Sequence, residues 1–243
     1  RGSQGPDLSA IPSIAIGQLE VLRDGASALY GSDAIAGVLN FRLRTEREGG
    51  SLVARYGQFY AGDGQDILLQ GNLGLSFTDR GFVNISGEYV NSDVTSRGIQ
   101  RPDAQALIDA GVQEVPVPAQ RWGNPSNEAA RVFVNAGIDL SDDLKFYTFG
   151  NYSWSKGVTD FFYRNPNTSF LATSVPLTAT PGGARFSLRQ RFPGGFTPQF
   201  GATITDASVV GGLRGQLLTN LTYDVSASFG RNTADYRITN TIN

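Results

Sequence analysis

The chain of 243 residues contains no cysteine, no histidine and no methionine. Without cysteine it can form no disulfide, no thiol nucleophile and no thiolate metal site. Without histidine it lacks the commonest metal ligand and the usual acid–base residue at neutral pH. These absences exclude serine triads and histidine-based zinc or haem sites. We therefore expect no enzymatic activity, no cofactor and no bound metal.

Charged side chains are also scarce. The 20 basic and 22 acidic residues make up 17% of the chain and leave a net charge of −2, whereas soluble domains average about 25% charged residues. This balance offers no polycation for nucleic acid, which we do not expect as a partner. No apolar run of about 18 residues could cross a bilayer as a helix. Because the mean hydropathy is only −0.19, two classes remain open: a transmembrane β-barrel with alternating faces, and a soluble β-sandwich rich in glycine turns.

Alternating apolar and polar residues predict seven strands. The clearest is 67–77, which sets Ile67 and Leu69 on the face opposite Gln70 and Asn72. Such alternation is typical of strands, and about 9–11 residues let a tilted strand cross a bilayer. The segment 144–155 is aromatic on both faces, and 205–218 is interrupted by glycines. The predicted strands are 51–60, 67–77, 82–91, 131–141, 144–155, 205–218 and 223–229.

The predicted connections alternate between short and long. Turn residues occupy 78–81, 141–143 and 219–221, whereas 92–130 and 157–203 are long excursions and 61–64 is a short loop. Compact domains seldom carry loops beyond about 12–15 residues, but outer-membrane barrels combine short periplasmic turns with long outer loops. The polar faces also carry Asn, Ser and Gln rather than Lys and Glu, as a wet lumen would. The pattern favours a barrel, with a short loop helix over 103–110.

The first forty residues follow a different pattern. Residues 19–23 predict a short strand, 24–25 a turn, 26–30 a helix ended by Gly31, and 38–43 a second strand. This mixed α/β element cannot belong to a barrel wall. Its glycines do not form a phosphate-binding motif, because neither Gly-Lys-Ser/Thr nor Gly-x-Gly-x-x-Gly is present.

The same segment carries a family motif. Leu19-Glu20-Val21-Leu22-Arg23, followed by Ala28-Leu29-Tyr30-Gly31-Ser32-Asp33-Ala34-Ile35-Ala36-Gly37-Val38-Leu39-Asn40, resembles the end of the plug domain of TonB-dependent outer-membrane receptors. In that family the motif leads into the first strand of a 22-stranded barrel, as 49–52 would here. The resemblance implies a mostly β fold: residues 1–48 as the C-terminal part of a small α/β plug domain, and 49–243 as about seven strands of a partial transmembrane antiparallel β-barrel.

Two departures from the family pattern stand out. Asp24 lies between Arg23 and Gly25, where the family often has Arg-Gly-Pro. Most of the plug, the TonB box and about two thirds of the barrel are missing from this sequence. An open seven-stranded sheet would leave an unpaired edge. Together with the missing initiator methionine, this predicts that the chain is a fragment of a longer receptor.

The resemblance implies energy-coupled import of a scarce, bulky nutrient across the outer membrane of a Gram-negative bacterium. Its partners would be TonB with ExbB and ExbD, outer-membrane lipid and the imported ligand. A ferric siderophore is the preferred substrate, with glycan and cobalamin left open. Two alternatives are a passive porin, which would lack the plug motif, and a soluble carbohydrate-binding or adhesion protein, which would need polar outward faces.

The resemblance also nominates plug residues. Arg23 matches the plug arginine that pairs with barrel glutamates in the family, and those glutamates are expected in the missing strands. The alternative is an exposed arginine at the end of a strand. For Glu20 the alternative is a solvated charge, and Tyr30 and Asp33 are expected to set the local fold of the plug. The nominated plug-motif residues are Glu20, Arg23, Asp24, Tyr30, Gly31, Asp33 and Asn40.

Two loop segments combine aromatic residues with arginine. Arg121 and Trp122 lie in the first long loop, and Tyr163 and Arg164 lie in the second. Such pairs suit an anionic chelate or a sugar ring, and these four are the candidate ligand contacts. The alternative is an aromatic girdle at the membrane interface. Asp63 and Asp66 fit no EF-hand spacing, so 63–66 predicts a polar hairpin tip rather than a calcium site.

Overall fold

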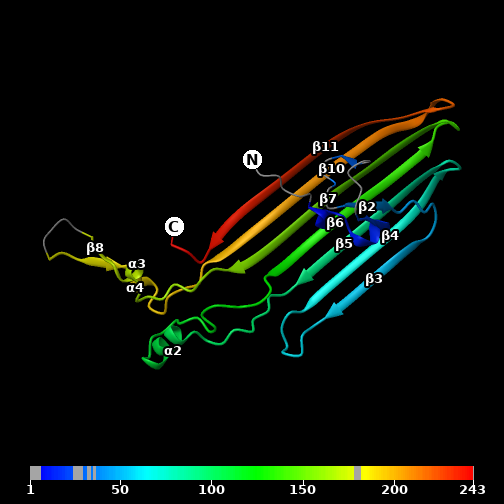
Figure 1. Cartoon of the computed structure of the whole chain (residues 1–243). Coiled ribbons are helices and arrows are strands. Elements are labelled where there is room, and N and C mark those ends of the chain that lie inside the picture. The colour runs from blue at the N-terminus through cyan, green and yellow to red at the C-terminus, as the bar shows by residue number, and fades with distance from the viewer. Residues whose placement is uncertain (1–6, 24–29, 32–33, 35–36, 178–181, 243) are drawn as a thin grey trace.

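A computed structural model describes residues 7–23, 30–31, 34, 37–177 and 182–242. Its main feature is a single antiparallel sheet of seven strands in the order β11-β10-β7-β6-β5-β4-β3, which we call the wall (Figure 1). The sheet is open, with β3 and β11 at its edges. The strands of the wall are β3 (Gly50–Gly57), β4 (Asp66–Thr78), β5 (Gly81–Ser92), β6 (Ser126–Asp139), β7 (Leu144–Asp160), β10 (Gln199–Leu218) and β11 (Leu221–Thr239).

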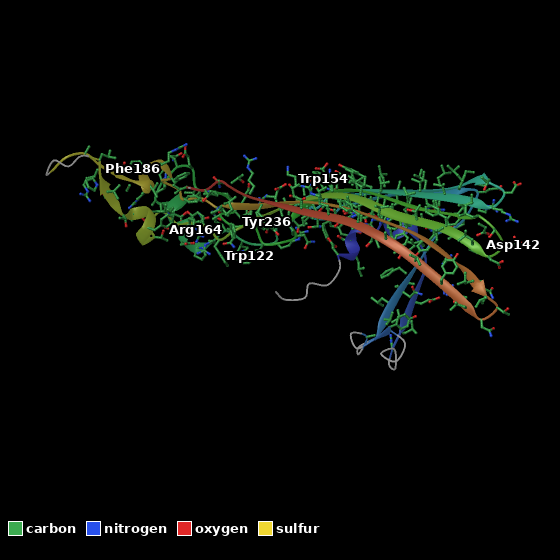
Figure 2. The ribbon with its side chains drawn as sticks, turned by 90° about the horizontal axis from the view of Figure 1, so that it is seen from above. Trp122, Asp142, Trp154, Arg164, Phe186 and Tyr236 are labelled. Carbon is green, nitrogen blue, oxygen red and sulfur yellow. The ribbon has the colours of Figure 1, made fainter. Side chains whose placement is uncertain are left out.

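The described residues of 7–48 form a separate element, which we call the N-terminal unit. It contains two short 3-10 helices, η1 (Leu8–Ala10) and η2 (Ser13–Ala15), and the antiparallel strand pair β1 (Ile16–Leu22) and β2 (Val38–Leu43). The β1–β2 pair projects from one face of the wall (Figure 2). Its two strands confirm those predicted here, although β1 begins earlier. The predicted turn 24–25 and residues 26–29 of the predicted helix lie outside the described residues.

The alternation in the sequence located all seven strands of the wall. Each short connection is a tight hairpin, joining β4 to β5, β6 to β7 and β10 to β11. The long excursions connect β5 to β6 and β7 to β10, so the long loops extend from the end of the wall opposite the tight turns (Figure 1). The predicted alternation of short and long connections is therefore confirmed.

The strands are longer than the sequence indicated. β6 begins at Ser126, β7 continues to Asp160, β10 begins at Gln199 and β11 ends at Thr239. These extensions lie at the loop end of the wall. In β6 and β7 polar residues occupy both faces there, so no alternation marks the extension. In β10 and β11 the apolar residues change face, from Val209 and Phe229 to Phe200 and Tyr236, so the alternation of the turn end does not continue into the extension. Main-chain hydrogen bonds to the neighbouring strand hold these segments in the sheet.

The predicted strand 205–218 is confirmed, and β10 runs unbroken through the glycines that interrupt its alternation. Two of these glycines accommodate close neighbours rather than breaking the strand. A Cβ at Gly212 would lie 2.6 Å from the Tyr147 ring, and one at Gly215 would lie 2.1 Å from the main-chain oxygen of Asp143. Glycine in a strand interior often marks such a close approach.

The two faces of the wall differ in chemistry. On the face covered by the N-terminal unit, which we call the inner face, five polar side chains are buried: Gln70, Asn72, Asn84, Ser86 and Ser153. The outer face carries exposed apolar side chains, among them Leu69, Leu73, Leu75, Phe77, Val132, Val225 and Phe229. The sheet thus buries polar groups and exposes apolar ones, the reverse of a soluble domain.

The two long loops contain the remaining elements. The first loop holds α2 (Pro102–Asp109), which confirms the predicted loop helix. The second holds α3 (Ser169–Ala172), β8 (Ser174–Pro176), β9 (Arg185–Ser187) and α4 (Leu188–Arg191), of which β8 and β9 pair with each other. No helix in the described part of the chain is long and apolar enough to cross a membrane.

Candidate functional site: the inner face and the loop unit

The segment that leads from β2 into β3 is held to the inner face by hydrogen bonds to its main chain. Asn135 Nδ2 on β6 donates to the oxygen of Arg44 at 2.8 Å, and Asn84 Nδ2 on β5 donates to the oxygen of Glu46 at 3.4 Å. Arg47 in turn donates to the main-chain oxygen of Thr78. Amides that bond to carbonyl oxygens can bind and release a segment without exposing apolar surface to water.

The same segment approaches β4 closely. The Gly74 N–H donates to the oxygen of Gly49 at 2.8 Å. A Cβ on Gly74 would lie only 2.4 Å from the oxygen of Glu46. The absence of a side chain at position 74 therefore lets the segment lie flat against the wall.

Among the nominated plug-motif residues, the structure brings Glu20 and Asn40 together. They are register partners in β1 and β2, and Asn40 Nδ2 donates to Glu20 Oε2 at 2.9 Å. Arg42 Nε forms an ion pair with Glu20 Oε1 at 2.8 Å. Glu20 therefore joins the two strands of the N-terminal unit, rather than standing as a lone solvated charge.

The other motif residues occupy the far end of the β1–β2 pair. Arg23 follows β1 and is exposed, and no carboxylate of the described residues pairs with it. The prediction that it binds barrel glutamates beyond this sequence stays a prediction. Tyr30 is helical and exposed, and Gly31 has φ +90°, the left-handed conformation common just after helix ends. Asp24 and Asp33 lie outside the described residues.

The two long loops pack together into one structure, which we call the loop unit (residues 93–125 and 161–198, as far as described). Ala104, Ala119 and Tyr163 form its small apolar core. Asn165 Nδ2 in the second loop donates to Asp103 Oδ2 in the first at 3.2 Å. The Tyr163 hydroxyl donates to the main-chain oxygen of Gly194 at 2.6 Å. The loops are thus preorganised against each other.

The four candidate ligand contacts differ in their availability. Arg121 forms a bidentate ion pair with Asp160, at 2.7 and 2.6 Å. Tyr163 is buried in the loop unit, whereas Trp122 is half exposed and meets Phe162 edge-on with the ring centroids 6.2 Å apart. Arg164 is exposed and pairs through its main chain with Phe196. A ligand role for these residues stays a prediction, with Trp122 and Arg164 the most accessible of the four.

A line of aromatic rings beside these candidates was not predicted. The Phe161 and Phe200 centroids are 5.8 Å apart, and Phe200 stacks on Tyr236 at 5.4 Å. Near this line, Phe161 and Arg164 border a hollow of about 490 Å³, lined also by Phe170, Phe196, Pro198, Ile238, Thr241 and Ile242. Phe200 and Tyr236 meet only through the pairing of β10 with β11, so no sequence spacing indicates the line.

Two titratable groups of the loop unit have shifted pKa values. Burial raises the pKa of Tyr163 to about 12, and the nearby Asp103 carboxylate adds to the rise while Arg101 opposes it. The pKa of Asp103 is lowered, chiefly by the hydrogen bond from Arg101, and burial partly opposes this shift. Both groups therefore keep one protonation state across the physiological range.

The predicted polar hairpin tip carries ion pairs. Asp63 pairs with Arg97, and Asp66 Oδ1 pairs with Arg55 at 3.0 Å. Among the described residues, no three acidic side chains converge as a metal site would require. Asp63 therefore joins the tip of the β3–β4 hairpin to the first long loop, and Asp66 joins the two strands of the hairpin to each other.

Comparisons with known proteins agree with this geometry. Residues 1–38 match the family model described as TonB-dependent Receptor Plug Domain. The fold is similar to that of BauA, the ferric preacinetobactin receptor from Acinetobacter baumannii, with a TM-score of 0.50 and 14% sequence identity. The similarity covers 94% of this chain and 38% of that receptor, so the chain spans well under half of its length. The resemblance to TonB-dependent receptors and the fold class predicted from the sequence are confirmed.

Proposed function

We propose that this chain is the end of the plug and the first seven strands of a TonB-dependent receptor, which imports a bulky nutrient across the outer membrane. One observation carries the proposal. The N-terminal unit, which overlaps the segment that matches the plug model, lies on the polar inner face of a sheet whose outer face is apolar. A water-filled interior and a lipid-facing exterior require that arrangement. Binding and movement of the ligand then need no covalent step and no catalytic residue.

The dimensions of the outer face support a place in the membrane. On β4 the outward residues from Ile67 to Phe77 are apolar. The two ends of this stretch are ten residues apart along the strand. At about 3.4 Å per residue this stretch measures about 34 Å. A strand tilt of about 40° reduces its height to about 25 Å, the height of the apolar band in outer-membrane barrels. On β6 the corresponding stretch runs from Ala130 to Leu140 and is bounded by Glu128 and Asp142.

The hydrogen-bonded inner face supports transport by displacement of the plug. TonB, driven by ExbB and ExbD, would pull on plug residues that precede this sequence. Contacts such as Asn135 to Arg44 can exchange with water one at a time. An apolar interface of equal size would resist separation more strongly, because its surface would become exposed at once.

A ferric siderophore is the substrate that we propose. Arg164 and the nearby aromatic rings combine a cation with flat apolar surfaces, which suits an anionic chelate with aromatic groups. The similar receptor BauA is described as the ferric preacinetobactin receptor. Glycan and cobalamin are the competing substrates that an experiment must separate.

The test uses the full-length receptor in a Gram-negative strain that lacks its own siderophore receptors. We expect uptake of iron-labelled siderophore that is abolished when TonB is deleted. Uptake of labelled cobalamin or oligosaccharide under the same TonB dependence would reassign the substrate. Uptake of small solutes that persists without TonB would contradict the proposal and favour a passive porin.

A further inference from the structure

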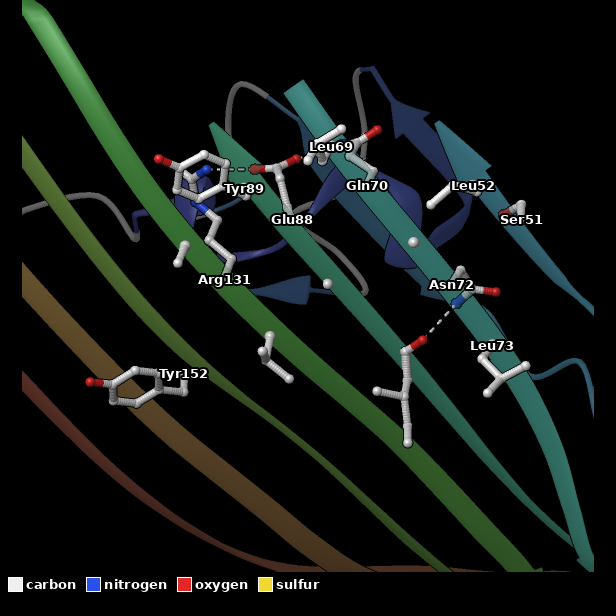
Figure 3. Close-up of a pocket in the computed structure, with 15 residues that line it drawn as sticks. Ser51, Leu52, Leu69, Gln70, Asn72, Leu73, Glu88, Tyr89, Arg131 and Tyr152 are labelled. Atoms are coloured by element: carbon white, nitrogen blue, oxygen red, sulfur yellow. Dashed lines mark hydrogen bonds and ion pairs between the residues drawn. The ribbon is translucent and has the colours of Figure 1, made fainter. Parts of the chain in front are cut away.

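Three polar residues form a row across the inner face of the wall. Gln70 on β4, Glu88 on β5 and Arg131 on β6 are register partners of one another in adjacent strands (Figure 3). Directly opposite residues on neighbouring strands have their Cβ atoms about 4.5–5.5 Å apart, so their side chains can interact. A slip of one residue in any strand would move its member of the row to the outer face.

The row forms one continuous chain of polar contacts that ends on the N-terminal unit. Arg131 pairs with Glu88 Oε1, and Gln70 Nε2 donates to Glu88 Oε2. The same Nε2 donates to Ser13 Oγ at 2.8 Å. The side chains of Arg131 and Glu88 are only 12% and 11% exposed. Gln70 therefore connects a shielded ion pair of the wall with the first residue of η2.

The ion pair determines which end of the Gln70 amide faces Ser13. A carboxylate only accepts hydrogen bonds, so Glu88 must meet the NH₂ group rather than the carbonyl oxygen of Gln70. The NH₂ group has two hydrogens, and the second is directed to Ser13. Arg131 pairs with the other carboxylate oxygen of Glu88 and so fixes the orientation in which the carboxylate meets the Gln70 amide.

The partner of this row is a segment that is already buried against the wall. Pro12 is fully buried, and Ile14 and Ala15 are 8% and 3% exposed. η2 packs against both β4 and β5. At the start of the segment, Asp7 has a lowered pKa, caused first by the hydroxyl and main-chain N–H of Ser9 and to a smaller degree by the charge of Arg131.

We propose that Gln70 is the anchor that holds residues 7–15 to the wall, and that Glu88 and Arg131 are positioning residues that direct its amide at Ser13. The inference deepens the proposed function and rests on it for its setting in a receptor. Within that receptor, the anchor is the contact that must open before this part of the plug can leave the wall. Arg23, the residue that the family motif nominates, lies elsewhere in the N-terminal unit and takes no part in the anchor.

Hydrogen exchange in the full-length receptor, held in lipid nanodiscs, tests the anchor. We expect Q70L and S13A each to speed exchange of the amides of residues 8–15 roughly three- to tenfold, as the loss of one hydrogen bond should. Because the two variants remove the same bond, the double variant should exchange no faster than either single one. The matched control is N151A, which removes an inner-face bond to Asp206 of 2.7 Å that does not involve the N-terminal unit.

The positioning role has its own readout. E88Q should speed exchange of residues 8–15 in the natural background but have no further effect on them once Gln70 is leucine. R131K, which keeps the positive charge, should restore most of the protection lost in R131M. A general loosening of the wall would instead speed exchange of the β5 amides to the same extent and would persist in the Q70L background.

The proposal is overturned if Q70L leaves exchange of residues 8–15 unchanged, if Q70L and S13A have additive effects, or if N151A has the same effect as Q70L. None of these readings depends on transport. Coupled effects of Q70L and S13A in a receptor that shows no TonB-dependent uptake would refute the proposed function and leave the anchor standing.

Discussion

The side-chain amide of Asn135 donates to the main-chain oxygen of Arg44 across 2.8 Å, although the two residues are 91 positions apart in the sequence. Arg44 lies just after β2, and Asn135 lies on the inner face of β6. This bond, together with that of Asn84, holds the segment between the N-terminal unit and the wall in place.

Replacing Asn135 by leucine should loosen this segment. The substitution leaves the oxygen of Arg44 without its donor, which costs about 1–3 kcal/mol for a shielded carbonyl. We expect faster proteolysis between residues 43 and 49 in the folded full-length receptor. N232L is the control, since Asn232 bonds to Asp206 and not to the N-terminal unit. Equal cleavage rates in N135L and N232L would contradict the prediction.

Two glycines of β4 should differ in how well they tolerate alanine. A Cβ at Gly74 would clash with the oxygen of Glu46 at 2.4 Å, whereas one at Gly71 would meet nothing closer than Leu52 Cδ1 at 3.9 Å. G74A should lower the free energy of unfolding by about 1–3 kcal/mol, as overpacking does. G71A should change it by less than about 0.5 kcal/mol. Denaturant titration of the two variants side by side distinguishes these outcomes.

Tyr163 should make the loop unit sensitive to alkali. Burial raises the pKa of Tyr163 to about 12 from an ordinary value of 10.0. Because the folded pKa is the higher one, its contribution to stability is complete below pH 10 and is lost as the pH rises through 12. Ultraviolet absorbance of tyrosinate should show a late-titrating component that loses the contribution of one residue in Y163F. That variant also loses the bond to Gly194, at a cost of about 1 kcal/mol.

Asp103 should make the same unit sensitive to acid. Its pKa is lowered from 3.8, first by the hydrogen bond from Arg101 and further by that from Asn165. The folded pKa is the lower one, so the contribution to stability is present above pH 3.8 and is lost as the pH falls through the folded value. Amide protection of α2 should decline with acid in the natural protein. A D103N variant with the same acid profile would argue against this cause.

The two faces of the wall should tolerate lysine differently. Val134 lies on the outer face between Val132 and Ala136, and Asn151 lies on the inner face. If the outer face meets lipid, V134K should cost about 2–4 kcal/mol near the middle of the bilayer. N151K points into a polar interior and should cost much less. Reversible unfolding from bilayers measures both, and equal costs would contradict the membrane placement.

Much of the wall could be predicted because its pattern is local. Alternation such as that of Leu69, Gln70 and Asn72 repeats every two residues, so a short window identifies a strand and its two faces. The hairpin turns at 78–81 and 141–143 are equally local. The ends of β6 and β7 were missed because polar residues occupy both of their faces, and those of β10 and β11 because their apolar residues change to the opposite face.

In the candidate site, too, some features could be predicted from the sequence and others could not. The motif around Glu20 and Asn40 was visible in the sequence, and its match to the plug model confirms the resemblance. The burial of Tyr163 and the pairing of Arg121 with Asp160 were not visible, because both depend on residues far apart in the sequence: Tyr163 packs against the other long loop, and Arg121 reaches the end of β7. A residue type indicates what a side chain can do, whereas its neighbours determine whether it is free to do it.

The sequence by itself determined the class of this protein: its missing cysteine and histidine, its seven alternating strands and its plug motif follow from composition and short spacings. Only the tertiary structure decided that Gln70 meets Ser13, that Asn135 holds Arg44, and that Phe200 stacks on Tyr236. The physical reason is register. Strand pairing aligns residues that lie far apart in the chain, and no local pattern encodes which of them will face each other.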